Sequence, residues 1–222
     1  MTHKTENHSC LVIFDFDGVI ADSKTAYAQQ MSETLNQFSD KQFTLENILS
    51  RVGNTDLRDD FKEFLETEDS EIIDSAIQTY VDLTDKYSYL RKLYPNANRI
   101  LEKIHVSHFT GIVSRKPQKR MDHWLQYFNI MHLFDYPIGT IERTKSDAIL
   151  RIQEKYRIPS DRTFMIGDTE FDIKSAKQAG VKSVFAFYGA SEPEKVLKLN
   201  PDFIINDLEE ILSILSNCEK RA

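Results

Sequence analysis

The sequence lacks several features that mark common classes of protein. Its longest apolar run is too short to span a bilayer, so we expect no membrane partner. The first ten residues are polar, with no hydrophobic signal core behind a basic start, so nothing predicts secretion. Two cysteines, Cys10 and Cys218, give neither a disulfide framework nor a CxxC pair. We therefore predict a cytoplasmic protein with reduced thiols.

The chain also lacks a block of basic residues. Lysine and arginine number 28 against 35 aspartates and glutamates, and the formal net charge is −7. Binding of nucleic acid needs clustered cations that neutralise phosphates, so we expect no nucleic-acid partner. The overall field repels anions, so any site for an anionic ligand must be local, built from a few cations, backbone amides and a metal.

The chain has no internal repeat, but the type of element changes along it. Residues 11–14, Leu-Val-Ile-Phe, form a continuous apolar run that is typical of a parallel strand buried on both faces. From Pro95, which is expected to begin a helix, helical and strand-like segments alternate. This alternation predicts a parallel sheet with helices on both faces. The later strands are expected at residues 109–113, 136–141, 163–166, 183–187 and 203–205.

Residues 23–90 interrupt this alternation with helical signals only. They hold a single glycine and two apolar stripes at three- and four-residue steps, which predict long amphipathic helices that pack on each other. The stripes are Tyr27, Met31, Leu35 and Phe38, and then Ile73, Ile77, Tyr80, Thr84 and Tyr87. We predict an α/β fold with a Rossmann-like parallel-sheet core, residues 1–22 and 91–222, and an inserted all-helical cap domain, residues 23–90.

Polar residues follow the predicted strands at the sheet edge where open parallel sheets bind ligands. Taken singly, each has an ordinary interpretation as a turn residue, a helix cap or a solvated lysine. Together, at successive strand ends, they offer carboxylates, a hydroxyl and an ammonium to one site. They are Asp15 and Asp17 after the first strand, Ser114 and Arg115 after the second, Lys145 after the third, and Asp168 and Asp172 after the fourth.

The carboxylates indicate a metal site. Asp15 follows directly on an apolar strand, where an unpaired carboxylate is costly. Asp15 and Asp17 repel each other unless a cation lies between them or one of them holds a proton. A hard divalent cation with oxygen ligands meets this need, and Asp168 can complete the cluster.

Four segments resemble the motifs of the haloacid dehalogenase-like superfamily. Residues 14–23, Phe-Asp-Phe-Asp-Gly-Val-Ile-Ala-Asp-Ser, are similar to its first motif, and residues 167–172, Gly-Asp-Thr-Glu-Phe-Asp, to its fourth. Val113-Ser114 and Lys145 are similar to the second and third. The resemblance spans residues 11–215. It fits phosphatases with a helical cap after the first motif, the group of phosphoglycolate phosphatase and beta-phosphoglucomutase-like proteins.

The resemblance implies a phosphatase that hydrolyses a small phosphorylated metabolite through an aspartyl-phosphate. Asp15 would be the nucleophile, and Asp17 would act first as acid and then as base. Ser114 and Lys145 would hold the oxygens of the transferring group.

The resemblance also implies Mg²⁺ as the cofactor. In the family its ligands are the side chain of the first aspartate, the backbone carbonyl of the second and the aspartate of the fourth motif. These correspond to Asp15, Asp17 and Asp168, and Asp172 would be a neighbouring partner or an occasional ligand.

The substrate stays open, and phosphoglycolate, a sugar phosphate or a nucleoside monophosphate are all candidates. In capped relatives the insertion largely determines specificity, which indicates Arg51, Gly53 and Asn54 as candidates here, beside Arg115 in the core. Arg51 is equally well explained as an exposed surface residue; as a ligand it would clamp a carboxylate or a second phosphate. Capped relatives often have Asn in place of Arg115 and Pro in place of Ser146, so a relative's substrate is not transferred to this chain.

Two other functions are compatible with parts of the pattern. A phosphosugar mutase of the same superfamily keeps the same residues and stays open as an alternative. A phospho-accepting signalling module is disfavoured by the helical insertion and by residues 167–172, and a haloalkanoate dehalogenase by Asp17, which those relatives lack. We expect a monomer or a weak homodimer.

Overall fold

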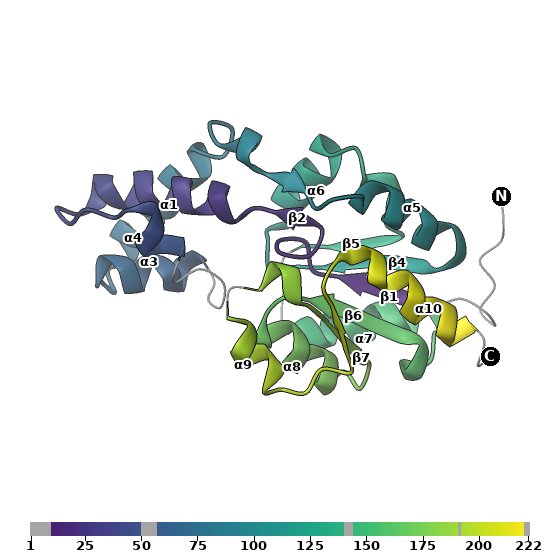
Figure 1. Cartoon of the computed structure of the whole chain (residues 1–222). Helices are drawn as coiled ribbons and strands as arrows, with labels where there is room; N and C mark the ends of the chain where they lie inside the picture. The colour runs from purple at the N-terminus through teal and green to yellow at the C-terminus, as the bar shows by residue number, and fades with distance from the viewer. Residues whose placement is uncertain (1–9, 50–56, 140–143, 191, 220–222) are drawn as a thin grey trace. The chain divides into compact units, whose positions relative to one another are not determined.

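A computed structural model describes residues 10–49, 57–139, 144–190 and 192–219 (Figure 1). The chain divides into two compact units, Met1–Ala21 with Leu93–Ala222, and Asp22–Lys92. The two crossings between them pair as short strands, β2 (Ala21–Asp22) and β3 (Lys92–Leu93). Within the described ranges, no helix has the length and apolarity needed to cross a membrane.

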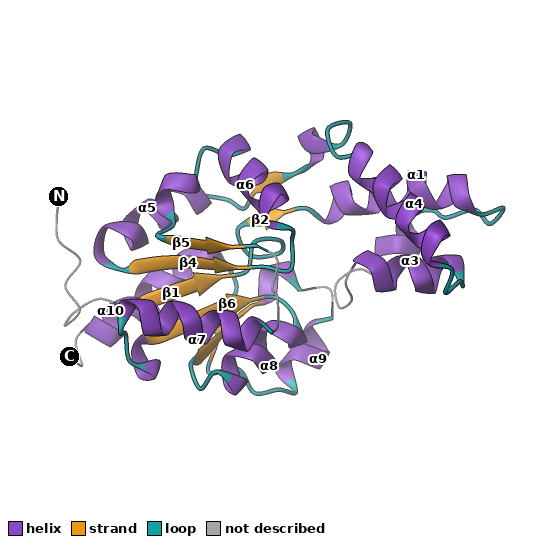
Figure 2. Ribbon diagram, turned by 180° about the vertical axis from the view of Figure 1, so that it is seen from behind, coloured by secondary structure: helices purple, strands orange, loops and turns teal. Residues whose placement is uncertain are grey.

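The first unit is built on a six-stranded sheet in the order β5-β4-β1-β6-β7-β8, and every neighbouring pair is parallel. Figure 2 shows β5, β4, β1 and β6 side by side in this order. Its strands are β1 (Leu11–Phe14), β4 (Phe109–Val113), β5 (Tyr136–Ile138), β6 (Thr163–Gly167), β7 (Lys182–Ala186) and β8 (Phe203–Ile205). The central strand β1 is fully buried, as its continuous apolar run predicts. Val12 and Phe14 point into one hydrophobic core, and Leu11 and Ile13 into another.

Helices cover both faces of this sheet. The core around Val12 and Phe14 contains apolar residues of α5 (Ala97–Ser107), α6 (Gln118–Tyr127) and α10 (Ile211–Glu219). The core on the opposite face contains residues of α7 (Lys145–Tyr156) and α8 (Glu170–Gln178). A short helix, α9 (Pro193–Leu197), and the 3-10 turns η2 (Met131–Leu133), η3 (Ser160–Arg162), η4 (Phe187–Gly189) and η5 (Leu208–Glu210) complete the unit.

The second unit is helical. It consists of α1 (Lys24–Phe38), α2 (Leu45–Leu49), α3 (Leu57–Leu65), α4 (Ser70–Asp82) and the 3-10 turn η1 (Ser88–Leu90). The apolar stripes of α1 and α4 meet in one core, which includes Met31, Leu35, Ile73 and Tyr80. The architecture confirms the predicted fold class, a parallel-sheet α/β core with a helical insertion.

Several predicted element boundaries are wrong. The strand expected to reach residue 141 ends at Ile138, and residues 140–143 lie outside the described chain. The helix expected to begin at Pro95 begins at Ala97, because Asn96 adopts a left-handed conformation with φ of 60°. The second helical stripe is also shorter, since α4 ends at Asp82 and Thr84 follows in a turn.

Candidate active site

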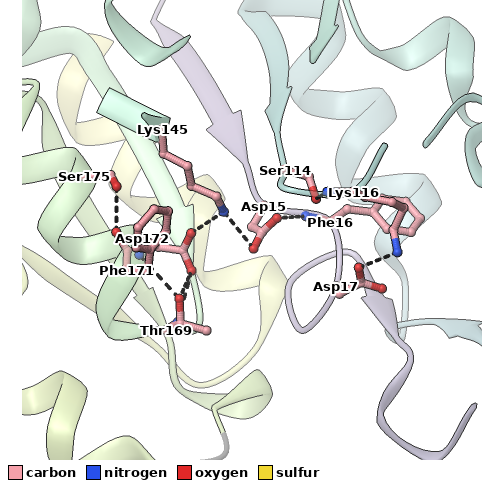
Figure 3. Close-up of polar contacts among 10 residues, drawn as sticks. All are labelled: Asp15, Phe16, Asp17, Ser114, Lys116, Lys145, Thr169, Phe171, Asp172 and Ser175. Carbon is pink, nitrogen blue, oxygen red and sulfur yellow. Dashed lines mark hydrogen bonds and ion pairs between the residues drawn. The ribbon is translucent and has the colours of Figure 1, made fainter. Parts of the chain in front are cut away.

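The carboxyl end of β1 places Asp15 at the edge of the sheet. The backbone N–H of Asp15 donates to the Ile166 carbonyl at 2.9 Å, so the backbone at Asp15 is still held by the neighbouring strand β6. Figure 3 shows the Asp15 side chain between two groups of residues, one from α7 and the start of α8 and the other from the loops that follow β1 and β4. The fold thus brings the ends of β4, β1 and β6 to one site.

Lys145 forms ion pairs with two carboxylates of the site, those of Asp15 and Asp172. Its Nζ lies 2.9 Å from Asp15 Oδ2 and 2.6 Å from Asp172 Oδ1 (Figure 3). The lysine is 1% exposed and Asp172 is fully buried. Burial alone would lower the pKa of Lys145, but the charges of Asp15 and Asp172 outweigh burial and raise this pKa above its usual value. Lys145 is therefore a charged ammonium at neutral pH.

Asp172 is fixed by the start of α8. Its Oδ2 accepts hydrogen bonds from the Thr169 backbone N–H at 3.1 Å and from the Thr169 hydroxyl at 2.6 Å. The Asp172 N–H donates back to Thr169 Oγ1 at 3.4 Å, which completes a capping box. Gly167 is required beside it, because a Cβ there would lie 2.0 Å from the Cβ of Asp172. Asp172 is thus a rigid support for the Lys145 ammonium.

Three carboxylates form a cluster with the donor chemistry of a hard cation. Asp15, Asp168 and Asp172 each offer one oxygen, and these oxygens all lie within 4.8 Å of one another. When all three carboxyl groups are ionised, the single positive charge of Lys145 leaves two negative charges in excess, which a divalent cation would balance. Oxygen donors in this arrangement suit Mg²⁺.

The pKa of Asp15 also favours a cation at this cluster. Burial raises this pKa above its usual value; the charges of Asp172 and Asp17 raise it further, and Lys145 only partly offsets the increase. A nucleophilic carboxylate must be ionised, so a cation next to Asp15 would favour its reactive form. Because Asp172 already accepts from Lys145 and Thr169, it is better suited to support this site than to be a principal ligand.

The Asp17 side chain lies outside this cluster and contacts a residue that the sequence analysis did not single out. Lys116 Nζ, from the loop after β4, lies 2.9 Å from Asp17 Oδ2 (Figure 3). The Lys116 backbone N–H donates to Ser114 Oγ at 3.3 Å, and Ser114 is buried. The position of Lys116, two residues after Ser114, was the only indication of its role in the sequence. The ion pair itself depends on β4 lying beside β1 in the sheet, and the sequence pattern does not specify which strands are neighbours.

Two glycines let the loops of the site approach closely. Gly18 has φ of +75°, and a Cβ there would lie 2.1 Å from Asp168 Oδ2. A Cβ on Gly189, in the turn after β7, would lie 1.7 Å from the Gly18 carbonyl oxygen. Gly189 was also missed by the sequence analysis, because a glycine signals a turn without showing what it contacts.

Of the predicted substrate-binding residues outside the catalytic cluster, Arg115 is described by the structure and those of the helical unit are not. The Arg115 guanidinium lies 5.1 Å from the centre of the Phe171 ring, so it connects the loop after β4 to the start of α8. Phe171 is exposed. Arg51, Gly53 and Asn54 lie outside the described residues.

The chain is similar to known proteins over nearly its whole length. Residues 12–186 match the sequence model of the haloacid dehalogenase-like hydrolase family. A phosphoglycolate phosphatase of Vibrio parahaemolyticus is 26% identical, over 96% of this chain and 98% of its own. The pyrophosphatase PpaX of Anoxybacillus flavithermus is 27% identical, over 92% and 95%. The crystal structure of a predicted phosphatase from Clostridium acetobutylicum superposes with a TM-score of 0.80 at 26% identity, covering 94% of this chain and 99% of that one.

Proposed function

The chain belongs to the haloacid dehalogenase-like hydrolases, and from this membership we propose that it is a magnesium-dependent phosphatase acting on a small phosphomonoester. Asp15 is the nucleophile, and the reaction passes through an aspartyl-phosphate. The observation that carries the proposal is the Asp15 carboxylate at the end of β1, 2.9 Å from Lys145 Nζ and clustered with Asp168. The named phosphatase relatives support the same reaction class.

In the first half of the reaction, a carboxylate oxygen of Asp15 attacks phosphorus. The bond between this oxygen and phosphorus forms while the bond to the leaving oxygen breaks, and Asp17 gives its proton to the departing alkoxide. Lys145 and the Ser114 hydroxyl hold the negative oxygens of the transferring group. The buried Lys145 suits this role because its two carboxylate neighbours keep it charged and fixed in place.

In the second half, a water molecule attacks the phosphorus of the aspartyl-phosphate. Asp17, now a carboxylate, accepts a proton from this water, and the bond between phosphorus and Asp15 breaks. Inorganic phosphate leaves, the Asp15 carboxylate is restored and Asp17 is again protonated. An acyl phosphate hydrolyses readily, so a carboxylate nucleophile makes this second step easy.

The residues fit the cofactor that the family uses. Asp15 and Asp168 would hold Mg²⁺, together with the Asp17 backbone carbonyl, and the cation would reduce the repulsion between the anionic nucleophile and the anionic substrate. Asp172 orients Lys145 and supports the cluster from the side.

The substrate is proposed by class. A small phosphorylated metabolite such as phosphoglycolate, a sugar phosphate or a nucleoside monophosphate fits a site with one set of phosphate-binding groups, and the relatives add pyrophosphate as a candidate. Arg115 would bind a second polar group of the substrate, and Arg51 and Asn54 of the helical unit would contribute to selectivity. We also predict a cytoplasmic location and a monomer or weak homodimer.

Phosphate release from a panel of these compounds, with and without Mg²⁺, tests the proposal. We expect steady release from at least one compound, loss of activity with a chelator and recovery when Mg²⁺ is added. Return of the phosphoryl group to a sugar would instead identify a phosphosugar mutase. A stable phosphoprotein without turnover would identify a phospho-accepting module.

A further inference from the structure

The turn η4, which follows β7, contacts the loop that follows β1. The Tyr188 hydroxyl donates a hydrogen bond of 2.8 Å to the Val19 carbonyl, across 169 residues of sequence. Next to it, Gly189 approaches the Gly18 carbonyl so closely that a Cβ would lie 1.7 Å from its oxygen. Burial raises the pKa of Tyr188, so the hydroxyl keeps its proton and remains a donor.

The loop that receives this hydrogen bond carries Asp17. It is a tight turn closed by its own backbone bonds, from Gly18 N–H to the Ala21 carbonyl at 2.9 Å and from Ala21 N–H to the Phe16 carbonyl at 3.0 Å. The Val19 side chain is fully buried beneath it. Such a turn moves as one piece, so a bond that fixes the Val19 carbonyl also fixes the direction in which the Asp17 side chain leaves the backbone.

Tyr188 also contacts the chain where it returns from the helical insertion. Its ring meets that of Tyr94 edge to face, with centroids 4.7 Å apart and an interplanar angle of 75°. Tyr94 directly follows β3, and its backbone N–H donates to the Ile20 carbonyl at 3.0 Å. One side chain therefore holds the chain both before it enters the insertion and after it leaves.

We propose that Tyr188 is a positioning residue for Asp17: its hydroxyl anchors the turn from Phe16 to Ala21 and thereby aims the Asp17 carboxyl at the leaving oxygen. The proposal rests on the proposed phosphatase function. It predicts that the effect of losing Tyr188 depends on the leaving group, because Asp17 is needed as an acid only when the leaving group must be protonated. An alkoxide needs this proton, whereas p-nitrophenolate leaves as a stable anion without it.

The test compares Tyr188→Phe with the wild-type enzyme on two substrates, the best alkyl phosphomonoester of the panel and p-nitrophenyl phosphate. We expect kcat/KM for the alkyl substrate to fall by about tenfold relative to the aryl substrate, a part of the roughly 10²–10⁴-fold that a positioned acid contributes. Asp17→Asn serves as the reference for complete loss of the acid and should shift the same ratio further.

Tyr156→Phe is the matched control. It removes a hydrogen bond of the same kind, from a tyrosine hydroxyl to the Asp135 carbonyl at 3.2 Å. Asp135 lies at the start of β5, so this bond is at the amino ends of the parallel strands, opposite the carboxyl ends that form the candidate site. This variant should keep the wild-type ratio of alkyl to aryl activity. The comparison separates loss of a tyrosine hydrogen bond in general from loss of this one.

Two results would overturn the inference while leaving the phosphatase function intact. One is an unchanged ratio of alkyl to aryl activity in Tyr188→Phe, whether both activities stay at the wild-type level or fall equally. The other is failure of Tyr188→Phe to fold when Tyr156→Phe folds, as judged by thermal unfolding; this result, or an equal fall on both substrates, would make Tyr188 a structural residue only. If the wild-type protein releases phosphate from neither substrate, the proposed function falls and the inference falls with it.

Discussion

The Lys145 ammonium lies closer to Asp172, at 2.6 Å, than to Asp15, at 2.9 Å, so the candidate nucleophile shares its cation with a fully buried carboxylate. We predict that Asp172→Asn lowers kcat by about ten- to a hundredfold, the usual effect of losing a partner that orients a site group. The free energy of unfolding should fall by on the order of 3 kcal/mol, because a buried ion pair loses one partner.

Steady-state kinetics and urea unfolding check this prediction. Glu102→Gln, the same type of change at an exposed position on α5, serves as the control and should leave both quantities unchanged. If Asp172→Asn behaves like the control, Asp172 does not support Lys145.

Gly18→Ala tests the close approach of the first loop to Asp168. The new Cβ would collide with the Asp168 carboxylate, so we expect the Mg²⁺ concentration for half-maximal activity to rise by about ten- to a hundredfold. Gly180→Ala is matched in backbone conformation, with φ of +70°, but its Cβ would meet nothing within 4 Å. It should cost only about 1–2 kcal/mol of stability for the left-handed conformation and leave the Mg²⁺ dependence unchanged. Equal Mg²⁺ dependence in the two variants would count against a metal site at Asp168.

Lys116→Met removes the cation that contacts Asp17. We expect kcat to fall by roughly tenfold, because Asp17 loses the cation that favours its ionised form, the base of the second half of the reaction. This loss corresponds to about 1.4 kcal/mol of transition-state stabilisation. Lys119→Met removes an exposed lysine three residues further along and should have no effect. A loss of the same size in both variants would mean that the general positive charge of this segment, rather than the pair with Asp17, sustains activity.

Arg115→Asn places in this chain the residue that capped relatives often carry. We expect the order of preference in the substrate panel to change, while the activity towards p-nitrophenyl phosphate stays within about twofold, because surface changes away from the reacting atoms have small effects. Arg115→Lys keeps the charge but loses the planar group that lies over the Phe171 ring. An unchanged order of preference in both variants would exclude Arg115 from substrate selection.

The sequence was most informative where the physical constraint is local. The strands at 11–14, 109–113 and 203–205 have the predicted bounds. The reason is clearest for 11–14, since a strand buried on both faces must be apolar along its length. The predicted start of α5 was wrong because the backbone of Asn96, directly after Pro95, adopts a left-handed conformation. A single sequence does not show which asparagine will do so.

In the candidate site, too, some contacts could be predicted from the sequence and others could not. The carboxylates at strand ends could be expected to meet, because parallel strands deliver their carboxyl ends to one edge. The ion pair of Lys116 with Asp17 and the contact of Gly189 with Gly18 could not, because each joins loops from different strands through side-chain or backbone geometry.

The central claim is that Asp15 carries the phosphoryl group, and intact-protein mass spectrometry after rapid quenching tests it directly. With Mg²⁺ and a substrate from the panel, the wild-type chain should gain the mass of one phosphoryl group, and peptide mapping should place that group on Asp15. Asp15→Asn should fold normally, gain no such mass and release no phosphate. A phosphoryl group on another residue, or wild-type turnover by Asp15→Asn, would contradict the account.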